Sequence, residues 1–467
     1  MRSELTFRET DLIIVLAFDV GKRIKPHTVS KWLCKRFKIF SEKDHSYALL
    51  AIDNSILRKD YIDMKRYARL ALSAPQEISL YIKNQERLLR LPCRVSILLH
   101  SEGICIVTLW ICIKNKEITL PDLMFLRNKI LEDGVIYKEG SPHKVMDYIE
   151  KLIAPIEVSA LFGGDDFNSM NAAWDHYCER KIPLRNIKKR NPFYMIFPVI
   201  FVNDWICSCG CESLDSLIHN HGSELAALLL GLSDYSDISP KIVTKVLEEG
   251  ISYIQQMEFF LTASGGLGVT QKISDIYSKS KLDSLKKIYV AGIEFLVLMR
   301  YLVDTYDADI RMKMSYEKYE SPYRMAKLRK DINLGLEEYF NIKFVNAEPV
   351  FSLIRYGREI LGINEAVNVL LNRLSDLSQQ IITLYEEQKS NQSMYIQRFG
   401  TLLSTLFGLL SIIGLLSFIF EVCITIGLPP IISFLCSLLI GLPLMLFTFL
   451  YIYRRYRRIH RFSEGYL

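Results

Sequence analysis

The sequence lacks the short motifs that mark common catalytic sites. It contains no G-x-S-x-G of a serine hydrolase, no HExxH of a zinc protease and no phosphate loop ending in Lys-Ser/Thr. The glycine-rich run at residues 264–268 follows a helical pattern instead of a strand, so we interpret it as a turn between helices. No catalytic nucleophile stands out, and we expect a protein that is not an enzyme.

The sequence also lacks a disulfide framework and a signal peptide. Its ten cysteines are scattered, and Cys423 and Cys436 lie in or beside apolar segments, which favours a reducing compartment. The early apolar run at residues 12–18 is bracketed by Asp11 and Asp19 and is too short for a signal sequence. We expect this run to be a buried strand and the N-terminus to stay in the cytoplasm.

An excess of charge is missing as well. The formal net charge is +6 over 467 residues, and the arginines at residues 454–461 supply much of it. We therefore expect no nucleic-acid partner.

Charge is absent altogether from residues 399–420 and 431–453. About 22 residues of helix extend roughly 33 Å, enough to cross the hydrocarbon core of a bilayer. The second run contains Pro443, which membrane helices tolerate. We predict two transmembrane helices at residues 399–453, with the lipid bilayer as a partner.

The charges that flank the two runs predict their orientation. Lys389 and Arg398 precede the first run, RRYRRIHR follows the second, and the link EVCITIGLPP has no Lys or Arg. We expect a multi-pass protein of the cell inner (plasma) membrane, with both termini and a basic tail at residues 454–467 in the cytoplasm.

Small and hydroxyl side chains recur along one face of the first run. They allow close helix packing, or they line a pore in an oligomer. The stripe comprises Gly400, Ser404, Gly408, Ser411, Gly414 and Ser417. The pore-lining candidates are Thr401, Ser404, Gly408, Ser411 and Ser417, with Glu421 as an acidic ring at the outer mouth.

A coiled-coil seam precedes the first run. Apolar residues alternate at steps of three and four, which predicts a narrow apolar stripe whose partner is a sister chain or another helix of the same chain. A single helix should run from about Leu361 through the first span. The seam residues are Ile360, Ile363, Val367, Leu370, Leu374, Leu377, Ile381 and Leu384.

The rest of the chain predicts an α/β domain followed by helices. Strand-like runs occur at residues 12–18, 47–52, 94–99, 104–113 and 193–202, and the third and fourth should form a hairpin. A helical block is expected from about Pro240 to Lys330. We predict an α/β cytoplasmic domain (1–235), a helical layer (236–345), a stalk helix (346–398) and then the spans and the tail.

Two clusters could bind ligands. The segment CSCGCESLDSLIHNH offers soft ligands to zinc, but the common CxxC spacing is absent, so we favour small loop residues and do not expect zinc. A basic segment could hold a phosphorylated ligand or a lipid headgroup, although a solvated loop is favoured. The metal candidates are Cys207, Cys209, Cys211, His219 and His221; the phosphate candidates are Arg180, Arg185, Lys188, Lys189 and Arg190.

The order of domain, long helix, minimal link, second span and basic tail resembles the CorA-like magnesium transporter superfamily, together with the segment NRLSDLSQQIITLYEEQKSNQSMYIQRFGTLLSTLFGLLSIIGLL. The resemblance covers about the last 110 residues. It implies a homopentameric funnel, a pore lined by first spans, and Mg²⁺ or another divalent cation bound between cytoplasmic domains. The family's Gly-Met-Asn signature is absent, and its place is taken by residues 420–423, FEVC.

Two functions follow from these patterns. The first is a cation channel or transporter gated by its cytoplasmic domain. The second is a membrane effector of a nucleotide-signalled defence system, CRISPR-associated or another antiviral kind, that permeabilises the membrane in response to a nucleotide second messenger.

Overall fold

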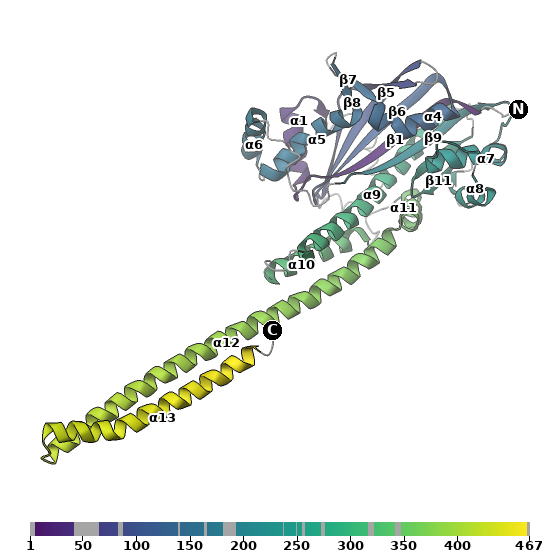
Figure 1. The fold of residues 1–467 in the computed structure, drawn as a ribbon. Helices are drawn as coiled ribbons and strands as arrows, with labels where there is room; N and C mark the ends of the chain where they lie inside the picture. Colours follow the sequence, from purple (N-terminus) through teal and green to yellow (C-terminus); the bar gives the residue numbers. More distant parts are fainter. Residues whose placement is uncertain are drawn as a thin grey trace. The chain divides into compact units, whose positions relative to one another are not determined.

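The computed structural model divides the chain into two compact units, Met1–Ser378 and Gln379–Leu467 (Figure 1). Each unit is described by itself. The structure describes residues 5–41, 65–82, 87–138, 141–162, 166–180, 193–236, 238–248, 250–254, 257–271, 276–315, 322–340 and 347–464.

The first unit is built on one large mixed sheet. The strand order is β10-β11-β12-β9-β1-β6-β5-β4-β7-β8, and β3 pairs with both β5 and β2. The neighbours are antiparallel except for the parallel pair of β9 and β12. The strands are β1 Leu5–Asp19, β2 Phe40–Ser41, β3 Tyr67–Leu72, β4 Gln76–Ile82, β5 Arg87–His100, β6 Ile104–Thr119, β7 Val135–Lys138, β8 Ser141–Lys144, β9 Met195–Cys207, β10 Ile251–Ile254, β11 Met257–Thr262 and β12 Gly265–Thr270.

Strand β1 lies in the middle of the sheet, between β6 and β9. Its residues from Leu12 to Ala17 are all buried, because helices cover both faces of the sheet. A strand buried on both faces is apolar throughout instead of alternating. The predicted strand at residues 12–18 is therefore confirmed, and so is the predicted hairpin, in which His100 pairs with Ile104.

Two groups of helices cover the two faces. Helices α1, α4, α5 and α7 pack on one face, and α9 and α11 pack on the other, where α9 contacts β1, β6 and β9. The helices of the first unit are α1 Pro26–Arg36, α4 Leu120–Asp133, α5 Val145–Phe162, α6 Phe167–Arg180, α7 Leu214–Leu230, α8 Pro240–Leu247, α9 Ile276–Ser315, α10 Pro322–Phe340 and α11 Glu348–Ile360.

The expected helical block from Pro240 to Lys330 is interrupted by strands β10, β11 and β12. The glycine-rich run expected as an interhelical turn belongs largely to β12. A Cβ atom on Gly268 would collide with the ring of Phe201, and one on Gly266 would press on Phe259. Glycine therefore serves close packing between strands here, a role that local helical patterning cannot reveal.

The predicted long helix is confirmed as α12, Ile363–Thr425, which contains 63 residues. It starts after Gly362, whose φ of 61° ends α11 and is easily adopted only by glycine. In the second unit, α12 is followed by α13, Pro430–Glu464. The link between them is shorter than expected, because the first helix continues past residue 420, and Gly427 turns the chain with a φ of 87°.

The seam of α12 packs first against its own chain. Ile363, Leu370, Leu374 and Leu377 are buried within the first unit. Arg373 forms an ion pair with Asp307 of α9. Of the two partners considered for this part of the seam, the structure provides a helix of the same chain.

Candidate functional site

The C-terminal half of α12 is apolar and exposed. Within the described part of the chain, α12 is the one helix that is long and apolar enough to cross a membrane. Of its most apolar 18-residue stretch, 6% is buried. Large side chains such as Phe399, Phe407 and Phe418 are more than 60% exposed. An apolar surface of this extent needs lipid or another protein to cover it. In α13 the apolar stretch that qualifies is shorter, Pro430–Pro443.

The two helices of the second unit, α12 and α13, run side by side (Figure 1). Small residues of α13 make the contact. Ser433, Ser437 and Gly441 are buried there, at steps of four that place them on one face. A Cβ atom on Gly441 would collide with the side chain of Leu416 on α12. The sequence signal for this contact is a small residue at every fourth position of α13, whereas we predict such a stripe only on the first span.

The glycines of the first-span stripe are left uncovered by the described side chains. Among those side chains and the backbone outside the local helix turns, no atom lies within 4 Å of a Cβ added at Gly400, Gly408 or Gly414. The hydroxyls of Thr401 and Ser411 donate to their own helix carbonyls, at 2.7 and 2.8 Å, which satisfies their protons within the helix and leaves the oxygens free to accept. Pore lining by Thr401, Ser404, Gly408, Ser411, Ser417 and Glu421 stays a prediction.

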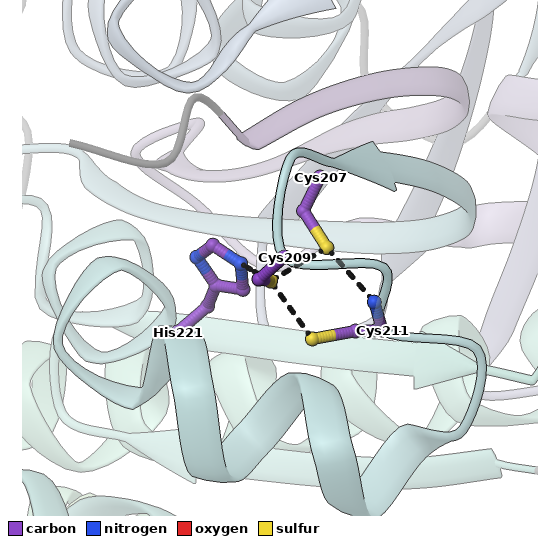
Figure 2. A group of neighbouring side chains, drawn as sticks. All are labelled: Cys207, Cys209, Cys211 and His221. Atoms are coloured by element: carbon purple, nitrogen blue, oxygen red, sulfur yellow. Dashed lines mark hydrogen bonds between the residues drawn. The ribbon is translucent and has the colours of Figure 1, made fainter. Parts of the chain in front are cut away.

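A compact cluster of sulfur and nitrogen atoms lies in the first unit, where β9 ends and α7 begins (Figure 2). Cys207, Cys209, Cys211 and His221 each offer one ligand atom, and all four atoms lie within 4.8 Å of one another. The Cys209 Sγ is 2.9 Å from Cys207 Sγ, 3.1 Å from Cys211 Sγ and 3.0 Å from His221 Nε2. Four of the five predicted metal candidates therefore come together.

The fifth candidate, His219, is exposed and lies outside this group. Two residues along a helix correspond to about 200° of rotation, so His219 and His221 point to different sides. Helix α7 is also locally unwound at His221, whose φ and ψ are −122° and 23°.

Three further residues, which the sequence pattern does not single out, order the cluster. Glu224 Oε1 lies 3.3 Å from His221 Nδ1, and Asn220 Nδ2 donates to Cys211 Sγ at 3.2 Å. Trp205 Nε1 donates to the Cys211 carbonyl, also at 3.2 Å. Glu224 follows His221 by three residues on α7, a spacing that brings side chains together on a helix.

The thiols of the cluster differ in acidity. Hydrogen bonding to Cys207 raises the pKa of Cys209 to about 12, with burial adding to the effect. Burial also raises the pKa of Cys211, but donors led by Asn220 outweigh it, so the pKa of Cys211 falls below its usual value. Without a bound cation, Cys211 is therefore the more acidic of the two thiols.

A cavity of about 450 Å³ lies on the sheet face covered by α9. Trp110, Cys112 and Lys114 reach it from alternate positions of β6. Asp11 carries an ion pair to the buried Lys286, at 3.4 Å. The lining residues are Asp11, Pro75, Pro92, Arg94, Trp110, Cys112, Lys114, Asp283 and Lys287. The sequence carries one signal for this cavity, the alternation of Trp110, Cys112 and Lys114, which by itself indicates only a strand.

The predicted phosphate cluster lies outside the described part of the chain. Arg180 ends α6, but its side chain is not described, and Arg185, Lys188, Lys189 and Arg190 fall outside the described residues.

A scan against protein-family models, a search of curated proteins and a search of solved structures each found no match to this chain.

Proposed function

We propose that this chain is a CorA-like oligomeric membrane channel or transporter for cations, gated by its sheet-containing unit. Helix α12 carries the proposal. Its first part is buried against the first unit through Leu370, Leu374 and Leu377, and its last part is exposed and apolar. A continuous helix transmits a displacement at one end to the other, because each of its turns is hydrogen-bonded to the next.

In this proposal α12 and α13 both cross the plasma membrane. Their link carries no Lys or Arg, whereas Lys389, Arg398 and the arginines from 454 onward lie on the other side of the spans. Positively charged flanks stay in the cytoplasm. The first unit and the end of α13 are then both cytoplasmic.

The same proposal assigns the uncovered glycine stripe of α12 to contacts between sister chains around a pore. The face of α12 that meets α13 is marked by Ile412 and Leu416. Gly408 stands four residues before Ile412 and adjoins this face, whereas the exposed Ser404 and Gly414 lie away from it. Each chain then packs one face of α12 on its own α13 and offers the other to its neighbours. The resemblance favours five chains, with Mg²⁺ or another divalent cation as the conducted or gating ion.

Flux through proteoliposomes tests the proposal. We expect the purified protein to run as a homo-oligomer by native mass spectrometry and to admit Mg²⁺ to an entrapped indicator dye. Replacing Ser404→Leu should reduce the flux at least about tenfold, because the larger side chain fills the close approach of the helices. Leu406→Phe is the matched control, since a step of two residues puts it about 200° away on the helix.

The proposal is contradicted if the protein is oligomeric and inserted but the vesicles stay impermeable both with and without divalent ions. A monomer would remove the central pore and leave the two helices as an anchor.

One observation favours the second candidate, a membrane effector opened by a nucleotide in a defence response. The cavity on the α9 face offers Arg94, Lys114 and Lys287 for phosphates and Trp110 for a base. Because α9 also holds α12 through the pair of Asp307 and Arg373, a ligand there would act on the helix that leads to the membrane. Such a ligand would have to bind the open and closed states unequally.

Calorimetry with ATP and with cyclic di-AMP tests this candidate on the detergent-purified full chain. Lys114→Ala should weaken binding at least about tenfold if a phosphate contact is lost. Lys116→Ala is the control, because Lys116 donates to the Arg90 carbonyl at 2.6 Å and does not line the cavity. Equal binding by the two variants would remove the cavity as the nucleotide site.

A further inference from the structure

We propose that Cys207, Cys209, Cys211 and His221 bind one structural zinc ion. This inference is independent of the proposed membrane function, because all four residues belong to the first unit and none lines the α9 cavity. The spacing C-x-C-x-C had favoured small loop residues over zinc. What changes the interpretation is the fourth ligand, which the fold supplies from α7.

The chemistry of the donors matches zinc. Three thiolates and one imidazole form a closed Cys₃His set, a common ligand combination of structural zinc sites. A tetrahedral ion with Zn–S bonds of about 2.3 Å separates its sulfur atoms by roughly 3.8 Å. The sulfur contacts of Cys209, at 2.9 and 3.1 Å, are somewhat shorter. An outward shift of less than about 1 Å, which a χ1 change of an exposed cysteine provides, brings them to the metal-bound spacing.

The surroundings of the ligands are those of a metal site. The Glu224 carboxylate at His221 Nδ1 holds that nitrogen as the protonated one, so Nε2 presents its lone pair to the sulfurs. The backbone N–H of Cys211 donates to Cys207 Sγ at 3.2 Å, and Asn220 donates to Cys211 Sγ. Donors to sulfur stabilise thiolates, the form in which cysteine binds a metal.

The backbone around the ligands also converges on this point. Gly210 takes a φ of 69°, and the resulting tight turn brings Cys209 and Cys211 to the same side. The break in α7 at His221 turns a fully buried imidazole toward the turn. An unwound position inside a helix destabilises the fold unless another interaction compensates for the strained backbone. A bound ion offsets this cost.

The ion would join the end of β9 to α7. Helix α7 packs on β11 and β12, and β12 is the neighbour of β9 in the sheet. Zinc would therefore fix the covering of this edge of the sheet, where Cys207, Cys209 and Cys211 are all free thiols.

Metal analysis of the full chain, purified in detergent without chelators, tests the proposal. We expect about one zinc per chain by inductively coupled plasma mass spectrometry. His221→Ala and Cys209→Ser should each lower the zinc content at least about tenfold, because both remove a ligand. His219→Ala and Cys178→Ser are matched controls outside the cluster and should keep full zinc.

Two measurements on the unaltered protein guard against variants that fail to fold. Cobalt substitution should give the intense visible bands of a tetrahedral thiolate site. Chelation should lower the melting temperature, and added zinc should restore it. The proposal is overturned if the wild type holds no zinc after reconstitution, if Cys209→Ser keeps it, if mass analysis finds a disulfide among the three cysteines in the freshly purified protein, or if iron is bound in place of zinc.

Discussion

The Nη2 atom of Arg69 lies 2.6 Å from the Oε2 atom of Glu294, and both side chains are almost completely buried. The hydroxyl of Thr108 donates to the other carboxylate oxygen of Glu294 at 2.5 Å. This network joins strands β3 and β6 to helix α9. Helix α9 in turn lines the cavity through Lys287 and pairs with α12 through Asp307, so the buried pair fixes the element that connects the sheet to the long helix.

Removing one member of the buried pair should destabilise the first unit strongly. We expect Glu294→Ala to lower the free energy of unfolding by about 3–5 kcal/mol, because it leaves the Arg69 charge buried without its carboxylate partner. Urea denaturation followed by tryptophan fluorescence measures the loss. The control is Glu117→Ala, which breaks an exposed pair with Arg8 and should cost less than about 1 kcal/mol. Equal losses of unfolding free energy in the two variants would show that the buried pair contributes no more to stability than the exposed pair.

The cavity thiol Cys112 should make stability sensitive to alkaline pH. Burial, followed by the neighbouring Asp11 carboxylate, raises the pKa of Cys112 from 9.0 to about 12. The folded state therefore keeps a proton that the unfolded chain loses, so this contribution to stability is complete below about pH 9 and is lost as the pH rises toward 12. Melting curves across this window should fall more steeply for the wild type than for Cys112→Ala.

The same thiol should react slowly with iodoacetamide at pH 8, since the thiolate is the nucleophile. Exposed Cys178 provides the internal comparison in a peptide-resolved alkylation experiment. Alkylation of Cys112 as fast as that of Cys178 would contradict the raised pKa.

Two neighbouring leucines of α12 should behave differently. Leu370 is fully buried and Leu371 is 47% exposed. Leu370→Ala should cost about 2–5 kcal/mol through the cavity it leaves, whereas Leu371→Ala should change the stability of the unit by no more than about 0.5 kcal/mol. Pulse proteolysis in urea measures both. If Leu371→Ala is the more harmful variant, the seam faces a sister chain instead of its own unit.

The contact between the two helices of the second unit depends on the absence of a side chain at Gly441. Gly441→Leu should separate the helices, because any Cβ there overlaps Leu416. We expect a lower melting temperature in detergent and partial recovery when Leu416→Ala is added. Leu439→Ala is the control, since the Leu439 side chain on the same helix is 75% exposed. No recovery in the double variant would argue against direct contact at these two residues.

Much of the fold was predictable where a signal is local. Residues 12–18 read as a buried strand and the pair of runs around Ser101–Gly103 as a hairpin, because a turn and its flanking apolar residues are contiguous in the chain. The strands β10 to β12 were missed for the opposite reason. The strand β12 is rich in glycine, and its Gly266 and Gly268 are explained only by the rings of Phe259 on β11 and Phe201 on β9, which pack on it across the sheet.

The candidate sites also combine features that a local sequence pattern indicates with features that depend on distant segments. The three cysteines of the cluster stand within five residues of one another, so the sequence could flag them, but the choice of His221 over His219 required the break in α7. The sequence did not predict the cavity, because its lining residues come from three strands, a turn and α9.

The sequence by itself determined the properties that depend on consecutive residues: the uncharged stretch at 399–420, the helix that continues into it, and the central apolar strand. Hydropathy and helix continuity are local, because each residue's transfer energy and each i to i−4 hydrogen bond involve a short piece of chain. Only the tertiary structure decided which surfaces meet: Arg69 with Glu294, Gly441 with Leu416, and His221 with three cysteines. These contacts arise when distant segments pack together, and no local pattern specifies which partner each one finds.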